Sequence, residues 1–165
     1  MRRVVIIVGA LLVLAGANLT IYRKQQVLQS GRVVLLELAP VDPRSLMQGD
    51  YMALRFQVVN DAFRFSGGSP SHPPDGRLVL KLNEHGVGSF VRMDNSQGLA
   101  PDEVAIQYRI RNGQPRFATN AFFFQEGHAN LYTSARYGEF RVAPDGEAIL
   151  TGMRNGNYEH LGPVR

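Results

Sequence analysis

The sequence contains no cysteine, which excludes disulfide bonds and thiolate chemistry. A large excess of one charge is also missing, because 18 basic residues stand against 14 acidic ones. Arg2 and Arg3 belong to the N-terminal tip, and the chain beyond them has 16 basic residues. Nucleic-acid-binding domains concentrate much more positive charge than this. The composition therefore argues against a nucleic-acid partner.

Histidine is scarce and scattered. No two of the four histidines have the helical i, i+4 spacing or the tight-loop spacing of metal ligands. We expect no metal site and no cofactor, and loop or surface positions for the histidines, which are His72, His85, His128 and His160.

Charge is absent from the segment that runs from Val4 to Tyr22. At about 1.5 Å per helical residue, this segment approaches the roughly 30 Å thickness of the hydrocarbon core of a bilayer. Tyr22 suits an interfacial position, and Arg23 and Lys24 end the apolar run. Residues 1–24 are therefore predicted to form a membrane anchor that crosses the lipid bilayer once.

Two alternatives remain open for this segment. Ala15, Gly16 and Ala17 resemble a signal-peptide cleavage box, so cleavage near Ala17 would release the rest of the chain into the periplasm. The other alternative is a buried core helix, although such a helix normally has a polar face, and this segment has none.

Basic residues flank the predicted anchor on both sides. Arg2 and Arg3 favour an N-terminus inside the cell, whereas Arg23 and Lys24 oppose that orientation nearly evenly. We expect the N-terminus inside and the C-terminal domain outside the cytoplasm. In a bacterial cell this means a single-pass inner-membrane protein with a periplasmic domain.

Apolar and polar residues alternate in the predicted extracytoplasmic domain, residues 32–165, which follows a predicted short stalk at residues 25–31. Such alternation is typical of strands with one buried face. Strands are predicted at Arg32–Leu38, Tyr51–Val59, Arg77–Leu82, Val87–Met93, Asp102–Arg111, Arg116–Phe124, Glu139–Val142 and Glu147–Met153.

Turn signals join these strands. Asn112-Gly113 favours a hairpin because both residues tolerate positive φ, and residues 83–86 and 144–146 also predict turns. Residues 66–74 are rich in glycine and proline and predict a loop, and only Gly127–Arg136 resembles a helix. The predicted fold class is mainly β: an antiparallel barrel or sandwich with one short helix, preceded by the transmembrane helix.

Two segments carry a family resemblance. Residues 49–56 read GDYMALRF, and a later segment reads FFFQEGHANLYTSARYGEFRV. Both resemble the GDYXXLXY protein family, and the likeness extends from the apolar segment to about Val142. The resemblance implies a bacterial protein with an N-terminal membrane segment, association with a multi-spanning membrane protein, and no established biochemical activity. Phe56 replaces the last tyrosine of the signature, so we expect this position to supply an aromatic ring to the core.

The signature and the motif Arg136-Tyr137-Gly138-Glu139 supply the candidate site residues. If their polar members line one cleft, a ligand site is the hypothesis, and an ion pair between Asp50 and Arg136 would tie the motifs together. The alternative is a purely architectural role, in which Asp50 bonds a nearby backbone amide. The ligand-binding candidates are Asp50, Tyr51, Arg136, Tyr137 and Glu139, and the structural candidates are Gly49, Leu54, Phe56 and Gly138.

A hydrolase resembling signal peptidase is an alternative, with Ser45 as nucleophile and Lys81 as base. The spacing argues against it, because Ser45 precedes Leu46 rather than a methionine and lies four residues before Gly49. Lys81 also falls on the polar side of its predicted strand. An enzyme that uses Asp50 is a variant of the same hypothesis.

Basic residues recur on the polar sides of the predicted strands. If those sides converge, they form a basic patch suited to anionic headgroups or an acidic partner. The alternative is the ordinary solvated side of an antiparallel sheet. The residues concerned are Arg55, Arg77, Lys81, Arg92, Arg109 and Arg111.

These observations favour a non-catalytic accessory or binding domain that is held at the membrane. We expect it to act with an integral membrane partner or an envelope ligand. The alternatives are an envelope hydrolase and a periplasmic sensor of a small ligand.

Overall fold

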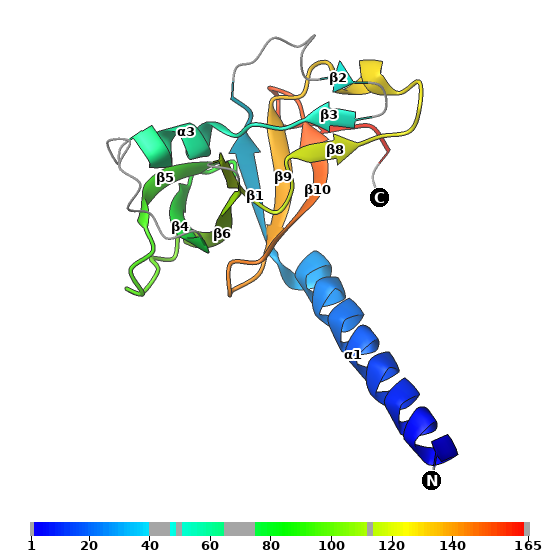
Figure 1. The fold of residues 1–165 in the computed structure, drawn as a ribbon. Coiled ribbons are helices and arrows are strands. Elements are labelled where there is room, and N and C mark those ends of the chain that lie inside the picture. Colours follow the sequence, from blue (N-terminus) through cyan, green and yellow to red (C-terminus); the bar gives the residue numbers. More distant parts are fainter. Residues whose placement is uncertain (1, 40–46, 49–50, 65–74, 112–113, 164–165) are drawn as a thin grey trace.

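One long helix stands apart from the rest of the chain (Figure 1). The structure is a computed structural model that describes residues 2–39, 47–48, 51–64, 75–111 and 114–163. Helix α1 (Arg2–Ser30) contains a segment, Val4–Ser30, that is long and apolar enough to cross a membrane, and its most apolar part is fully exposed. Residues 25–30, predicted as a stalk, continue this helix, so the connection to the domain is helical.

Two polar side chains in the apolar part of α1 each donate a hydrogen bond within the helix. Asn18 Nδ2 donates to the carbonyl oxygen of Leu14 at 2.8 Å, and Thr20 Oγ1 donates to that of Gly16 at 2.9 Å. Each internal bond lowers the cost of placing these side chains in lipid.

Strand β1 (Arg32–Glu37) leads from α1 into a four-stranded antiparallel sheet. It pairs with β9 (Tyr137–Val142), which pairs in turn with β10 (Ala148–Arg154), and β11 (His160–Leu161) completes the order β1-β9-β10-β11. The β9–β10 register shifts between Leu150 and Gly152, as at a β-bulge.

A second antiparallel sheet has the order β5-β4-β6-β7, and a third, smaller one has the order β2-β3-β8. One α-helix, α3 (Gln57–Arg64), and one 3₁₀ helix, η1 (Ala129–Tyr132), complete the described elements. The remaining strands are β2 (Met47–Gln48), β3 (Tyr51–Ala53), β4 (Asp75–Leu82), β5 (Gly88–Met93), β6 (Glu103–Arg111), β7 (Gln114–Arg116) and β8 (Ala121–Phe123).

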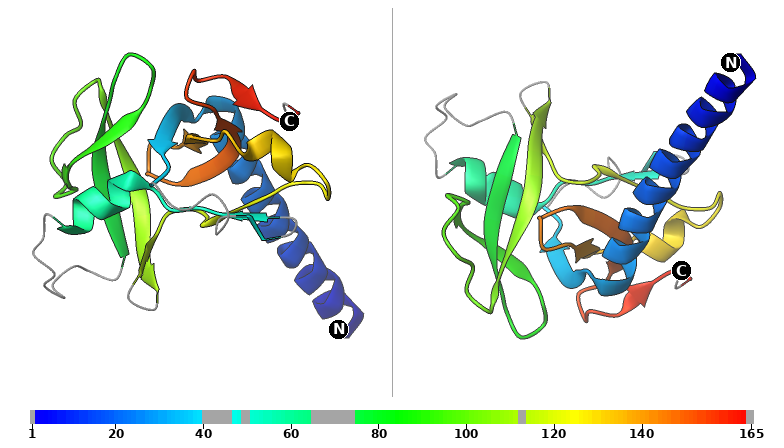
Figure 2. Two further views of the ribbon diagram at one scale, coloured as in Figure 1. Left: turned by 90° about the horizontal axis from the view of Figure 1, so that it is seen from above. Right: turned by 90° about the horizontal axis from the view of Figure 1, so that it is seen from below.

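Backbone contacts at two places connect the two large sheets into a curled half-barrel. Leu35 of β1 forms a parallel bridge with Val87 just before β5, and its N–H donates to the carbonyl of Gly86 at 2.9 Å. At the other side, the N–H of Gln107 in β6 donates to the carbonyl of Gly146, in the β9–β10 turn, at 2.9 Å. Figure 2 shows the resulting two lobes, with β4, β5, β6 and α3 in one and β9, β10 and η1 in the other.

The core fills the space between these lobes. Leu36, Leu80, Ile106 and Phe140 come from different strands and are fully buried. Each buried side chain of this size contributes roughly 1.5–3 kcal/mol. The cluster continues into the segment after β3, where Phe56 is also buried.

The mainly β, antiparallel fold class is confirmed, and so are two of the predicted turns. Gly86 has φ +77° and its N–H donates to Asn83 at 2.9 Å, while Gly146 has φ +89° and donates to Ala143 at 2.9 Å. Asn112-Gly113 lies outside the described residues, but the flanking strands pair antiparallel, with Arg111 opposite Gln114. The predicted loop at residues 66–74 also lies outside them.

The predicted strand Tyr51–Val59 is wrong beyond Ala53. Strand β3 ends at Ala53, and α3 begins at Gln57. Val58 and Ala62, one helical turn apart, are buried, while Gln57 Nε2 donates to Asp61 Oδ1 at 3.1 Å on the outer face. The alternation in residues 52–58 correctly predicted which side chains are buried, but it predicted the wrong backbone conformation after Ala53.

Two further predicted elements are corrected by the structure. The predicted strand Arg116–Phe124 is divided between β7 and β8, which belong to different sheets. The helix predicted at Gly127–Arg136 is only the short 3₁₀ helix η1, and the expectation of a single short helix missed α3.

Candidate binding pocket beside the apolar helix

The signature segment contributes mainly to the core. Leu54 and Phe56 are buried, and the ring of Phe56 packs edge-on against Phe140 with ring centroids 5.3 Å apart. Gly49 and Asp50 lie outside the described residues. Tyr51 is half-buried in β3, opposite Phe123 of β8, with ring centroids 5.8 Å apart.

The two motifs meet through Phe56 and Gly138. A Cβ atom on Gly138 would lie 3.0 Å from the Phe56 ring and 3.2 Å from the Phe140 ring, so the glycine leaves room for close aromatic packing. The motifs are therefore joined by an apolar contact. The hypothesised ion pair between Asp50 and Arg136 involves a residue that the structure does not describe.

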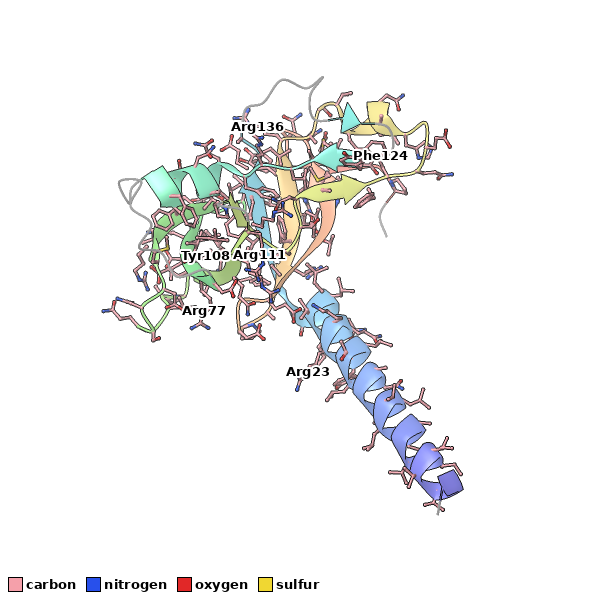
Figure 3. All side chains as sticks on the ribbon, in the orientation of Figure 1. Arg23, Arg77, Tyr108, Arg111, Phe124 and Arg136 are labelled. Atoms are coloured by element: carbon pink, nitrogen blue, oxygen red, sulfur yellow. The ribbon has the colours of Figure 1, made fainter. Side chains whose placement is uncertain are left out.

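Arg136 points away from this core, at the top of the molecule in Figure 3. Its guanidinium is largely exposed and lies 3.2 Å from Glu37 Oε1. The hydrogen bond to Glu37 raises the pKa of Arg136. An exposed pair of this kind contributes little to stability.

Tyr137 is buried in a stack of rings. Its centroid lies 5.2 Å from that of Tyr158, which stacks on His85 at 4.4 Å. Burial, and then the neighbouring Tyr158 hydroxyl, raise the pKa of the Tyr137 phenol. Tyr158 has φ +65°, a left-handed conformation that is uncommon outside glycine.

Glu139 is the one charged residue that is buried in the part of the chain that the structure describes. Only 5 % of its surface is exposed. Its carboxylate accepts from Arg154 Nε at 2.5 Å and from Thr151 Oγ1 at 3.3 Å, and its Oε2 lies 3.2 Å from His160 Nε2. Three partners from β10 and β11 therefore compensate the cost of removing this carboxylate from water.

A cavity of about 540 Å³, which we call the β10 pocket, opens at this carboxylate. One wall is aromatic: Phe124 stacks on Tyr132 at 5.3 Å, and Phe122 meets the same ring edge-on at 5.0 Å. Leu28, near the end of α1, also lines the cavity. The β10 pocket thus combines an apolar wall, a polar floor and a side formed by the apolar helix.

Among the predicted ligand-binding residues that the structure describes, Glu139 alone lines this pocket. Phe124, Tyr132 and Arg154 were not predicted as site residues. His160 is exposed, as predicted, and it also lines the pocket. Figure 3 shows Phe124 on the side of the molecule away from Arg77 and Tyr108. The aromatic run at residues 122–124 was the one signal of this wall in the sequence.

The predicted basic residues of the second sheet are largely matched by acids. The nitrogen–oxygen distances of these ion pairs are 2.7 Å for Arg77–Asp94, 3.4 Å for Lys81–Asp102, 2.6 Å for Arg92–Glu103 and 3.5 Å for Arg111–Asp75. Hydrogen bonds from Arg92, and then from the Ala100 N–H, lower the pKa of Glu103, while its carboxylate raises the pKa of Arg92. Arg55 lies apart, in the segment after β3.

The catalytic alternatives gain no support from these positions. The Lys81 side chain is 63 % exposed, whereas a Ser/Lys mechanism needs a desolvated lysine. Ser45 and Asp50 lie outside the described residues, as does His72. Within the described ranges, His, Asp and Glu side chains form no group of three or more that could hold a metal ion.

Comparison with known proteins places the chain in a family. The family model described as "GDYXXLXY protein" matches residues 13–153. No curated protein and no solved structure matches the chain. Because the match covers most of the sequence, the chain belongs to the GDYXXLXY protein family.

Proposed function

We propose that the protein is a membrane-anchored, non-catalytic binding domain whose β10 pocket receives an apolar segment of an integral membrane partner. Helix α1 would cross the bilayer once, with the N-terminus inside and the domain in the bacterial periplasm. The length and the uncharged composition of Val4–Tyr22 support this anchoring.

The observation that carries the proposal is the composition of the β10 pocket. Phe122, Phe124 and Tyr132 supply the kind of aromatic surface that dominates binding interfaces. Leu28 belongs to the last turns of α1, so an occupant would contact both the domain and the helix that emerges from the bilayer. A partner that lies in the same membrane can meet both surfaces at once.

Gly152 offers a direct test, because it lines the β10 pocket opposite Glu139. A Cβ atom there would meet the His160 ring at 3.6 Å, which is ordinary contact. Gly152→Leu should therefore fill the pocket without displacing the backbone. Gly98→Leu is the matched control, because nothing lies within 4 Å of a Cβ at Gly98.

The measurement is co-purification of the full chain from native membranes in several mild detergents. We expect one membrane protein to co-purify with the native chain and with Gly98→Leu. The amount that co-purifies with Gly152→Leu should be lower by about tenfold or more. Thermal unfolding checks that both variants are folded. Absence of a partner in every detergent, or equal recovery with Gly152→Leu, would contradict the proposal.

A periplasmic small-ligand sensor is the second candidate, and the size of the pocket favours it. About 540 Å³ lies within the range of small-molecule sites. Native mass spectrometry of the gently purified chain distinguishes a small-ligand sensor from a domain that binds a membrane protein. A bound compound of low mass that Gly152→Leu removes supports the sensor, and a protein adduct supports the accessory role.

A further inference from the structure

A second cavity, of about 370 Å³, has four basic side chains in its lining. We call it the arginine groove. It lies along the outward face of the β6–β7 hairpin and extends to α1 and the β9–β10 turn. Its charged lining residues are Lys24, Arg109, Arg111 and Arg116, with Glu147 as the one acid among them.

Two of these cations face each other directly. Arg109 of β6 and Arg116 of β7 are register partners in an antiparallel pair, so both side chains project from the same face of the sheet. Like charges in directly opposite positions destabilise a strand pair. Both residues are exposed, and neither has a carboxylate within ion-pair distance in the described part of the chain. Asp75 is the strand neighbour of Arg109 on β4, but its carboxylate lies against Arg111 at 3.5 Å.

The rest of this sheet face is matched in charge. Arg77, Lys81 and Arg92 project from the same face, and each is paired with a carboxylate. The unmatched positive charge is therefore concentrated at the arginine groove. An anion bound between Arg109 and Arg116 would remove their repulsion and accept hydrogen bonds from two guanidinium groups.

The groove is held at the end of the apolar segment of α1. Lys24 comes two residues after Tyr22, which corresponds to about 3 Å along a helix. The ammonium of Lys24 is paired with Glu147 in the β9–β10 turn. The β9–β10 turn is also bonded to β6, because Gln107 Nε2 donates to the carbonyl of Asp145 at 3.1 Å. Figure 3 shows Arg111 close to the end of α1 that adjoins the domain.

We infer that the arginine groove binds the phosphate-bearing headgroup of an anionic membrane phospholipid. A free phosphate ion shares this chemistry. The lipid is favoured because Lys24 places one side of the groove where headgroups lie, if Val4–Tyr22 occupies the hydrocarbon core. This inference rests on the proposed membrane anchoring and is independent of the β10 pocket.

The test uses the delipidated full chain in a neutral detergent, mixed with phosphatidylglycerol or with phosphatidylcholine. Native mass spectrometry counts the lipids that remain bound. The variant is Arg109→Ala with Arg116→Ala. The control with the same change in charge is Arg55→Ala with Arg136→Ala, two exposed arginines outside the groove.

We expect the native chain and the control to retain one phosphatidylglycerol in preference to phosphatidylcholine. The Arg109/Arg116 variant should bind phosphatidylglycerol about 30-fold more weakly, as expected for two basic residues near a headgroup. Inorganic phosphate at the same concentration should not displace the lipid.

Three results would overturn the inference: equal retention of the two lipids, unchanged retention by the Arg109/Arg116 variant, or displacement by inorganic phosphate. Displacement would assign the groove to a soluble phosphate compound. Failure of the anchoring itself is seen separately, as recovery of the intact chain from a detergent-free aqueous extract.

Discussion

Glu139 shows how far a single residue could be predicted from the sequence. The motif Arg136–Glu139 marked it as a candidate, but its burial and its partners Arg154 and His160 follow from the β9–β10–β11 register. Residues that lie 15 or more positions away give no local signal of such a contact. The aromatic wall was not recognised either, because the path of the chain between Phe124 and Tyr132 decides whether their rings meet.

Replacement of Glu139 should reveal its structural contribution. Glu139→Ala leaves Arg154 without its buried partner and should lower the free energy of unfolding by about 3 kcal/mol. Glu139→Gln should cost less, because the amide oxygen can still accept a hydrogen bond from Thr151. Urea unfolding of the full chain in detergent measures both.

Glu37→Ala is the control for this comparison. Its ion pair with Arg136 is well exposed, so its loss should cost at most about 1 kcal/mol. If Glu139→Ala and Glu37→Ala lowered the free energy of unfolding equally, burial of the Glu139–Arg154 pair would not add to stability.

At the scale of elements, alternation located most strands because each has one face in the core. It failed at residues 54–59, where Leu54, Phe56 and Val58 are all buried although the chain passes from strand β3 into helix α3. A short helix that contacts a sheet on one side buries some of the same positions as a strand would. Pattern alone therefore cannot separate the two over so few residues.

The pairing of β4 with β6 creates a buried phenol. Tyr108 lies opposite Gly76, and a Cβ atom at Gly76 would come within 2.8 Å of the Tyr108 ring, so only glycine leaves the ring this space. Tyr108 is almost fully buried. Burial, and then the negative charge of Asp75, raise the pKa of the Tyr108 phenol.

This raised pKa predicts an alkaline loss of stability. The folded chain holds the phenolic proton more tightly than the unfolded chain, so the stabilising contribution is complete below about pH 10 and is lost as pH rises through the raised pKa. Above about pH 10 the free energy of unfolding should decline less steeply in Tyr108→Phe than in the native chain. Urea unfolding at a series of alkaline pH values measures both slopes, and identical slopes would contradict the assignment.

At the scale of the whole molecule, the β10 pocket and the arginine groove both lie beside helix α1. Leu28 lines the β10 pocket and Lys24 lines the arginine groove, one helical turn apart on α1. The sequence predicted the apolar helix, the β-rich domain and the basic strand faces. It could not predict the two cavities, because each is formed by residues from several elements whose packing depends on the complete fold.

The proposed function depends most on the β10 pocket as the place where a membrane partner binds. The direct measurement is photo-crosslinking in native cells from position 125, where Gln125 is exposed and lines the pocket. Gln97, exposed in the segment after β5, is the matched control position. We predict one integral membrane protein crosslinked from position 125, absent from position 97 and lost when Gly152→Leu is added. No adduct from position 125, or the same adduct from both positions, would contradict the account.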